Sequence, residues 1–180
     1  MSGHGREGQA PPLRLLIVCL GNICRSPMAE GALRARVQAA GLDGLVEVDS
    51  VGTGSCHIGD PPDPRAIATA ARHGVDISGL RARQLCAADY RDFDWLLCAD
   101  PDNVADVVAR APAGARARFG LLMEWAGESA EGVPDPYTGG EAEFEHAWTL
   151  VDHAAQAIAR RIAAAAKAGG VHPGGGRSAD

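Results

Sequence analysis

The stretch that decides the fold runs from Leu13 to Pro27 and reads LRLLIVCLGNICRSP. Its first part, Leu13–Leu20, is apolar apart from Arg14, and it is short enough and rich enough in β-branched residues to be a buried strand. The stretch ends on Ser26 and Pro27, which favour a helix start because serine caps exposed amide groups and proline is tolerated in the first helical turn. The sequence therefore predicts a strand, a short loop and a helix in direct succession.

The same alternation of strand and helix continues along the chain. The first helix should end at Gly41, and the helix opened by Asp63 and Pro64 should end at Gly74, because glycine adopts the backbone conformation that ends a helix. Further strands are predicted at Val46–Val51, Phe93–Cys98 and Arg118–Leu122, and further helices from Asp100 toward Ala109 and from Glu141 to about Ala166. This order favours parallel β-α units in one sheet, an α/β fold.

Length and composition bound the class of protein. The 180 residues predict one domain over residues 13–167, and the Gly- and Pro-rich ends, residues 1–12 and 168–180, read as disordered tails. Seventeen basic against 23 acidic residues give a net charge of −6, which argues against a general nucleic-acid binder. No apolar run reaches the roughly 18 residues of a membrane-spanning helix, and no apolar signal-peptide core follows the first Met. We expect a cytoplasmic protein without a nucleic-acid or membrane partner.

The cysteines exclude two common structural roles. Their number is odd, they include no C-x-x-C pair, and the chain shows no export signal, so neither a disulfide framework nor a four-thiolate zinc site is expected. The spacing of Cys56, His57 and Asp60 matches no common metal site either, so we expect no metal and no other cofactor. The cysteines are Cys19, Cys24, Cys56, Cys86 and Cys98.

The loop after the first strand carries the chemistry. Cys19 and Arg25 stand at its two ends, and a chain that turns from strand to helix over five residues directs amide N–H groups inward, where they join the positive end of the helix dipole. Such a cradle binds phosphate, favours the thiolate form of a cysteine, and lets Arg25 bind two phosphate oxygens. Gly21 allows close approach of the backbone and Asn22 tolerates a left-handed conformation. The Ser26 hydroxyl is placed to donate to the thiolate.

With these motifs the sequence resembles the low-molecular-weight protein tyrosine phosphatases. The resemblance covers about Leu15 to Ile162, and its motifs are VCLGNICRSPMAE from Val18, VDSVGTGSCHIGDPPDPRA from Val48, FDWLLCAD from Phe93 and Asp135-Pro136-Tyr137. It implies a three-layer α/β/α fold with a four-stranded parallel sheet, of the phosphotyrosine protein phosphatase I type. It also implies hydrolysis of protein phosphotyrosine through a phosphocysteine intermediate, without a metal. A bacterial tyrosine kinase is one substrate that the resemblance suggests.

The resemblance also implies roles for individual residues. Cys19 matches the nucleophile, Arg25 the phosphate-binding arginine and Asp135 the general acid and base. A proton donor is needed because the phenolate leaving group of phosphotyrosine has a pKa near 10. Substrate-binding positions are Leu20, Gly21, Asn22, Ile23, Cys24, Ser26 and Tyr137. The polar network that shapes the loop matches Asn22, Ser26, Ser50 and His73.

This chain departs from the family pattern at the pocket rim. Many relatives carry an aromatic residue at the position of Cys56, and often another at that of Thr138, so Tyr137 and Leu20 are the expected apolar walls. The resemblance further suggests a reversible disulfide between Cys19 and Cys24 that protects the nucleophile. The alternative for Cys24 is a small buried core residue.

Three other functions stay open on the same scaffold. Protein arginine phosphatases tend to carry Thr where this chain has Ile23, which favours tyrosine here. Arsenate reductases need two further redox cysteines close together, whereas Cys86 and Cys98 are twelve positions apart. A non-catalytic phosphotyrosine-binding module would normally lack the nucleophile, the arginine or the acid, and none of these is missing.

Overall fold

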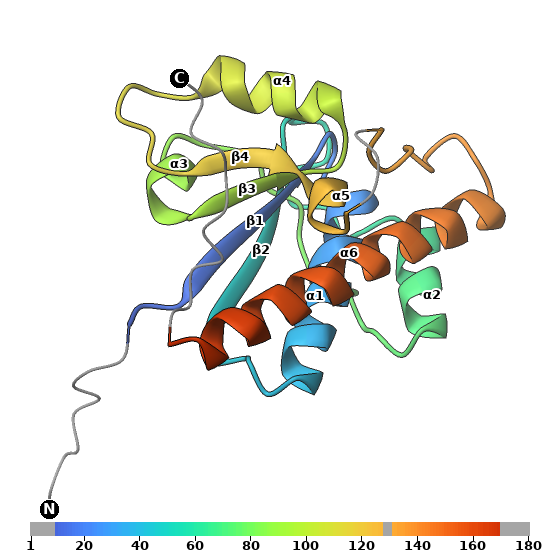
Figure 1. Ribbon diagram of the computed structural model, residues 1–180. Coiled ribbons are helices and arrows are strands. Elements are labelled where there is room, and N and C mark those ends of the chain that lie inside the picture. Colours follow the sequence, from blue (N-terminus) through green and yellow to red (C-terminus); the bar gives the residue numbers. More distant parts are fainter. Residues whose placement is uncertain (1–9, 128–130, 170–180) are drawn as a thin grey trace, which may run out of the picture.

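The computed structural model describes residues 10–127 and 131–169, so most of both predicted tails lies outside the described residues. Within the described part, four parallel strands form one sheet in the order β2-β1-β3-β4. The parallel α/β sheet is thus confirmed (Figure 1). Its strands are β1 (Leu13–Cys19), β2 (Val46–Gly52), β3 (Trp95–Cys98) and β4 (Arg118–Leu121).

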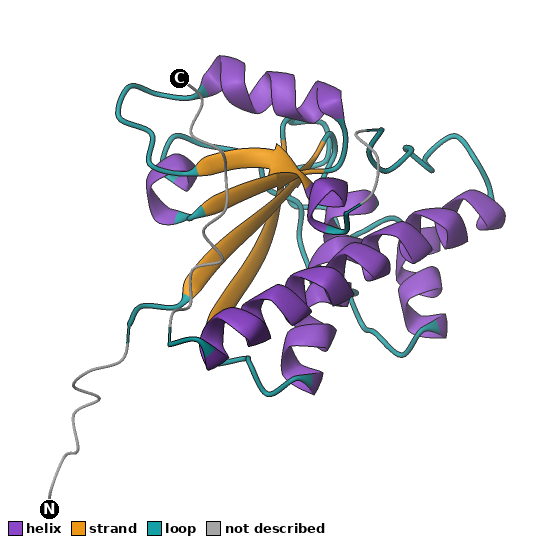
Figure 2. Cartoon of the chain, viewed as in Figure 1, coloured by secondary structure: helices purple, strands orange, loops and turns teal. Residues whose placement is uncertain are grey.

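Helices cover both faces of the sheet (Figure 2). On one face α1 contacts β1 and β2, and α6 packs across α1, α2 and α5; on the other face α4 contacts β3 and β4. The helices are α1 (Arg25–Ala39), α2 (Pro64–Arg72), α3 (Asp89–Asp92), α4 (Pro101–Arg110), α5 (Leu122–Trp125) and α6 (Glu141–Lys167). This arrangement is the expected three-layer α/β/α fold.

Alternate residues of β1 enter two different cores. Leu15 and Ile17 belong to the core under α1 and α6, whereas Leu16 and Val18 belong to the core under α4. All four side chains are fully buried. A central strand with helices on both sides has no solvent-facing side, which explains why this strand is apolar at nearly every position.

The predicted start of the first helix, with Ser26 as its cap, was wrong by two residues. Ser26 lies inside α1, which begins at Arg25, and the preceding Cys24 makes no side-chain capping bond. The glycine stops are confirmed, because Gly41 and Gly74 follow α1 and α2 with φ of 71° and 79°. A cap role for Ser26 fails because its hydroxyl is engaged by the loop before the helix.

Two short elements were missed. The one-turn helix α3 follows no apolar repeat, and the chain turns helical at Leu122, where a strand residue was predicted, to form α5. Residue Phe93 likewise belongs to the end of α3 and not to β3. A single helical turn contains too few residues to show a period in the sequence.

The outer edge of β2 is partly covered from the helical layer. Among the described residues β1 is the one strand of the sheet that pairs with β2, and on the outer side Gly52 alone forms a bridge, to Gln84, so the rest of that side has no strand partner. Arg34 on α1 donates from Nε and Nη2 to the carbonyl oxygen of Val48, at 3.2 and 2.7 Å. One outward carbonyl of the edge strand is therefore satisfied by a side chain.

Candidate active site

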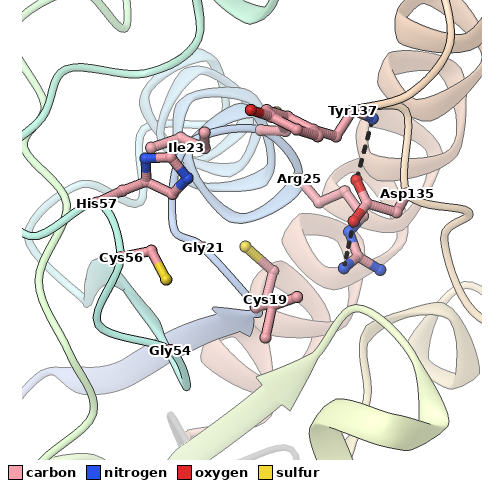
Figure 3. A pocket seen from close by; sticks show the side chains of 11 residues that line it. Cys19, Gly21, Ile23, Arg25, Gly54, Cys56, His57, Asp135 and Tyr137 are labelled. Atoms are coloured by element: carbon pink, nitrogen blue, oxygen red, sulfur yellow. Dashed lines mark hydrogen bonds and ion pairs between the residues drawn. The ribbon is translucent and has the colours of Figure 1, made fainter.

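A pocket of about 220 Å³ opens where β1 ends and the chain turns toward α1 (Figure 3). The sulfur atom of Cys19 points into it from the end of the strand. The pocket brings together residues from three loops that lie far apart in the sequence. Its lining is Cys19, Leu20, Gly21, Ile23, Cys24, Arg25, Gly54, Cys56, His57, Asp135 and Tyr137.

Two hydrogen-bond donors face the Cys19 sulfur. The backbone N–H of Asn22 donates to Sγ over 3.3 Å, and the Ser26 Oγ lies 3.0 Å from Sγ. Ser26 Oγ accepts a bond from Asn22 Nδ2 at 2.8 Å, and its own proton has two acceptors within reach, the sulfur at 3.0 Å and the carbonyl oxygen of Val51 at 3.5 Å. Donors around a buried sulfur favour its charged form, so this geometry suits a thiolate.

Asn22 organises the loop from behind the pocket. It has a φ of 56°, in the left-handed region that asparagine tolerates better than most residues. Its Nδ2 donates to the hydroxyls of Ser26 and Ser50, and its Oδ1 accepts the N–H of Arg83 at 3.0 Å. Both polar ends of the amide are thus bonded, which fixes the loop in its bent shape.

The network ends on a buried carboxylate that the sequence analysis missed. The Ser50 hydroxyl donates to Glu30 Oε1 at 2.8 Å, and the Glu30 side chain is only 2% exposed. Burial raises the pKa of Glu30 above its ordinary value, although Arg34 and Ser50 pull it down. The sequence signal was the spacing, since Glu30 follows Ser26 by four residues on one helix and so shares its face.

The end of β2 supports the loop on its other side. The N–H groups of Thr53 and Gly54 donate to the carbonyl oxygens of Cys19 and Leu20, at 2.9 and 2.8 Å. A side chain on Gly52 would place its Cβ only 2.7 Å from the Leu20 oxygen. Glycine at this position therefore permits the close contact between the two segments.

Arg25 is buried at the wall of the pocket and is held by two other segments. Its Nη1 donates to Asp100 Oδ2 at 2.5 Å and to the carbonyl of Val133 at 3.0 Å, and its Nη2 lies 3.7 Å from Asp135 Oδ2. Burial lowers the pKa of Arg25, but the Asp100 bond and the charges of Cys19 and Asp135 outweigh burial and hold it above its ordinary value. The guanidinium therefore stays charged beside Cys19.

Asp100 was not predicted as a site residue. It was interpreted only as the start of a helix, and its Oδ1 does cap α4 by accepting the N–H of Asn103 at 2.8 Å. Its second oxygen binds Arg25. The available signal was its place two residues after the end of β3, since the carboxyl ends of parallel strands meet at one edge of the sheet.

Asp135 approaches the pocket from the loop before α6. Its Oδ1 accepts the N–H of Tyr137 at 3.1 Å, and its side chain is 47% exposed. In Figure 3 its carboxylate lies beside Arg25 at the edge of the pocket. A carboxylate in this place, together with the donors around Cys19, is the set of groups that transfer of a phosphoryl group to sulfur requires.

The mouth of the pocket has exposed apolar and aromatic walls. Leu20 is 53% exposed and Tyr137 is 49% exposed. The ring of His57 faces that of Tyr137 with 6.4 Å between centroids. His57 was considered only as a metal-ligand type, although its position in the loop after β2, at the same edge of the sheet, was a signal for the pocket.

Three predicted site residues lie elsewhere than expected. His73 was assigned to the network around the nucleophile, but it ends α2, bonds Glu145 at 2.8 Å and stacks on Trp148, so that assignment was wrong. Asn22 and Ser26 do not line the pocket; they support its loop from behind. Ser50 does belong to the network, through Asn22.

The remaining cysteines differ in environment. Cys24 lines the pocket but is buried, and burial with the nearby charges of Asp63 and Cys19 raises its pKa above the ordinary value. Burial also raises the pKa of Cys98, to about 12. Cys56 and Cys86 are exposed, and all five thiols are free. Burial thus favours the protonated form of Cys24.

The described residues show neither a metal-binding cluster nor a membrane-spanning helix. They contain no group of three or more His, Cys, Asp or Glu side chains arranged to hold a metal ion. None of the described helices is long and apolar enough to span a membrane.

Comparison with known proteins gives a consistent result. The family model described as low molecular weight phosphotyrosine protein phosphatase matches residues 14–168. The chain is 40% identical over 134 residues to the low molecular weight phosphotyrosine protein phosphatase of Schizosaccharomyces pombe, covering 73% of this chain and 85% of that protein. It is 40% identical over 149 residues to the low molecular weight protein-tyrosine-phosphatase of Streptomyces coelicolor, covering 81% and 90%. The crystal structure of YfkJ from Bacillus subtilis superposes with a TM-score of 0.80 at 33% identity, covering 87% and 98%.

Proposed function

We propose that this chain, which belongs to the low molecular weight phosphotyrosine protein phosphatase family, hydrolyses protein phosphotyrosine and small aryl phosphates through a phosphocysteine intermediate. The observation that carries the mechanism is the environment of Cys19. Its sulfur faces the N–H of Asn22 and the hydroxyl of Ser26, and it shares one pocket with Arg25 and Asp135.

In the first step the Cys19 thiolate attacks phosphorus. Loop amides and Arg25 bind the phosphoryl oxygens, and the bond from phosphorus to the phenolic oxygen breaks while Asp135 delivers a proton to that oxygen. In the second step water attacks the phosphocysteine and the Asp135 carboxylate takes the proton of that water. Inorganic phosphate leaves, and the Cys19 thiolate and protonated Asp135 are restored.

The exposed walls of the pocket support an aryl substrate. Leu20, His57 and Tyr137 stand around its mouth, where they would flank the ring of a phosphotyrosine whose phosphate reaches Cys19. We place the reaction in the cytoplasm, because a nucleophilic thiol needs a reducing compartment. A bacterial tyrosine kinase is the narrower substrate hypothesis, and it rests on the family resemblance alone.

The first test is phosphate release from matched phosphotyrosine, phosphoserine and phosphoarginine peptides, with the native chain and Cys19→Ser under reducing conditions. We expect release from phosphotyrosine only, and none from the variant. Release mainly from phosphoarginine would contradict the interpretation of Ile23. Thioredoxin-dependent turnover of arsenate would instead support a reductase, and phosphate-competitive binding without release would support a binding module.

The role of Asp135 has its own test. Asp135→Ala should lower kcat on phenyl phosphate by about 10²- to 10⁴-fold, the usual contribution of a general acid. Asp102→Ala, which removes an exposed carboxylate in the first turn of α4, serves as the control and should leave kcat unchanged. Equal kcat values for Asp135→Ala and the native chain would exclude Asp135 as the acid.

We also propose that Cys24 protects the nucleophile reversibly. Peroxide converts the Cys19 thiolate to a sulfenic acid, and attack by the Cys24 sulfur forms a disulfide and releases water. The support is that both thiols line one pocket and both are free. After peroxide treatment a dithiol should restore activity to the native chain but not to Cys24→Ser, and mass spectrometry should detect the Cys19–Cys24 link. Equal recovery of both proteins would exclude this role.

A further inference from the structure

The start of α2 is joined to the loop that carries the nucleophile. Asp63 caps this helix, and its backbone N–H donates to the carbonyl oxygen of Ile23 at 2.8 Å. Ile23 lies between Cys19 and Arg25 and lines the pocket. The position of the first turn of α2 is therefore fixed relative to the loop from Cys19 to Arg25, called the phosphate loop below.

The Asp63 carboxylate in turn holds Arg65. Its Oδ1 accepts from the backbone N–H and from Nε of Arg65, at 2.8 and 3.0 Å, and its Oδ2 accepts from Nη2 at 2.9 Å. The Asp63 side chain is only 10% exposed. One edge of the guanidinium is thus locked to the helix start in a two-pronged pair, the geometry that arginine forms and lysine does not.

The other N–H groups of Arg65 reach the loop that carries Asp135. Nη1 donates to the carbonyl of Gly139 and Nη2 to that of Tyr137, both at 3.0 Å. The flat face of the guanidinium lies 4.6 Å from the ring centre of Phe144 at the start of α6. Arg65 therefore connects the phosphate loop, through Asp63, with the loop of the general acid.

We propose that Arg65 is a positioning residue that holds the Asp135 carboxylate in the position relative to Cys19 from which it transfers the proton. The link is short, because the Asp135 carboxylate is bonded to the N–H of Tyr137, and Arg65 holds the carbonyl of that same residue. Asp135 is itself about half exposed, so no surrounding core fixes its place. This inference rests on the proposed function, since it concerns the general acid of that reaction.

The test compares Arg65→Met and Arg65→Lys with Arg72→Met. Arg72 is the matched control, because it lies on the same helix, is as exposed as Arg65 (43% against 41%) and also pairs with a carboxylate, Glu145. The substrates are aryl phosphates whose leaving groups range from strongly acidic phenols to phenol itself. Proton donation matters most for the poorest leaving group, so a misplaced acid has a signature that a general loss of structure lacks.

For phenyl phosphate we expect both Arg65 variants to lower kcat by about 10- to 100-fold, the range that a misplacement of about 1 Å produces. For the most acidic phenol the loss should stay below about threefold, because that group leaves without a proton. Arg72→Met should match the native chain on every substrate. In an Asp135→Ala background, Arg65→Met should cause no further loss on phenyl phosphate, because the group it positions is gone.

Two outcomes would overturn the inference: an equal loss across all leaving groups, or an additional loss in the Asp135→Ala background. If Arg65→Met is unfolded by circular dichroism, Arg65→Lys decides, since it keeps the charge but not the two-pronged pair. A native chain that releases no phosphate from any aryl phosphate would overturn the proposed function instead. A native chain that is active while both Arg65 variants equal it on phenyl phosphate would overturn the role of Arg65 alone.

Discussion

The hydrogen bonds to the Cys19 sulfur come from residues nearby in the sequence, whereas the loop that carries Asp135 is held by residues that are distant in the sequence. Cys19 itself is buried, and residues seven or fewer positions from it supply the bonds to its sulfur. The loop of Asp135 is exposed, and its contacts to Arg25 and Arg65 span more than 70 positions of sequence. A contiguous motif can specify the donors around the sulfur, but only the complete fold can specify the place of Asp135.

The largest loss of activity should follow substitution of Arg25, which ends the loop of Cys19 and contacts the loop of Asp135. Arg25→Lys removes the planar fork of N–H groups, of which Nη1 bonds Asp100 and Val133 and the others would bind the phosphoryl group in the proposed reaction. We therefore expect kcat/KM for phenyl phosphate to fall about 10²- to 10³-fold, as when one donor to the transition state is lost. Arg36→Lys, on the same helix and in a two-pronged pair with Asp152, should stay near native activity. Similar values for both variants would show that the fork is not needed.

A smaller effect is expected at Asn22, where two substitutions distinguish the contribution of the backbone conformation from that of the side-chain hydrogen bonds. Asn22→Gly keeps the left-handed conformation but loses the amide bonds, and it should lower kcat about tenfold. Asn22→Ala loses the amide bonds and also disfavours the left-handed conformation. Its free energy of unfolding should be about 1–2 kcal/mol lower than that of Asn22→Gly, which is the cost of this conformation for a residue with a Cβ. Urea unfolding and aryl phosphate kinetics measure the two effects. Equal stability of the two variants would mean that the loop does not depend on this φ.

The smallest effect concerns pH and the carboxylate at the end of the network. A pKa raised in the folded protein means that the folded state binds the proton more tightly than the unfolded chain does, so stability from Glu30 declines as pH rises above the ordinary value of 4.5. The free energy of unfolding of Glu30→Gln should therefore rise relative to the native chain from pH 4.5 toward neutrality. Urea unfolding across this range measures the trend.

Glu47→Gln is the control for this trend, because Glu47 is an exposed carboxylate, 57% accessible, paired with Arg14 on the surface. Its difference from the native chain should not rise with pH in the way that the Glu30 difference does. If Glu30→Gln instead loses stability relative to the native chain toward neutral pH, then ionised Glu30 does not destabilise the folded protein, and the prediction is wrong.

The sequence was sufficient for the parts of the molecule that depend on local patterns. The apolar run of β1, the proline after Asp63 and the glycines after α1 and α2 predicted the elements to within a few residues. The spacing of Cys19 and Arg25 predicted the loop between them. Each of these features is set by residues within one turn or one strand, which is the range over which propensity and periodicity act.

The remaining site residues could not be found in this way. Asp100, Glu30 and Arg65 each have an ordinary local role, as a helix cap, a helical carboxylate and a partner of the preceding cap. Their contacts to Arg25, Ser50 and the loop of Asp135 exist only after folding. His73 shows the converse error, since a resemblance in sequence assigned it to a network that the chain does not bring within its reach.

The bond from Arg34 to the edge of β2 has a consequence for how copies of this protein meet. An outer strand with free carbonyl and N–H groups is a template on which a strand from another molecule can add, and repeated addition leads to aggregation. Arg34 occupies the Val48 carbonyl and places a cation along that edge. An incoming strand would have to displace this guanidinium, and the bonds between Gly52 and residues 83–85, before it could pair along the whole edge.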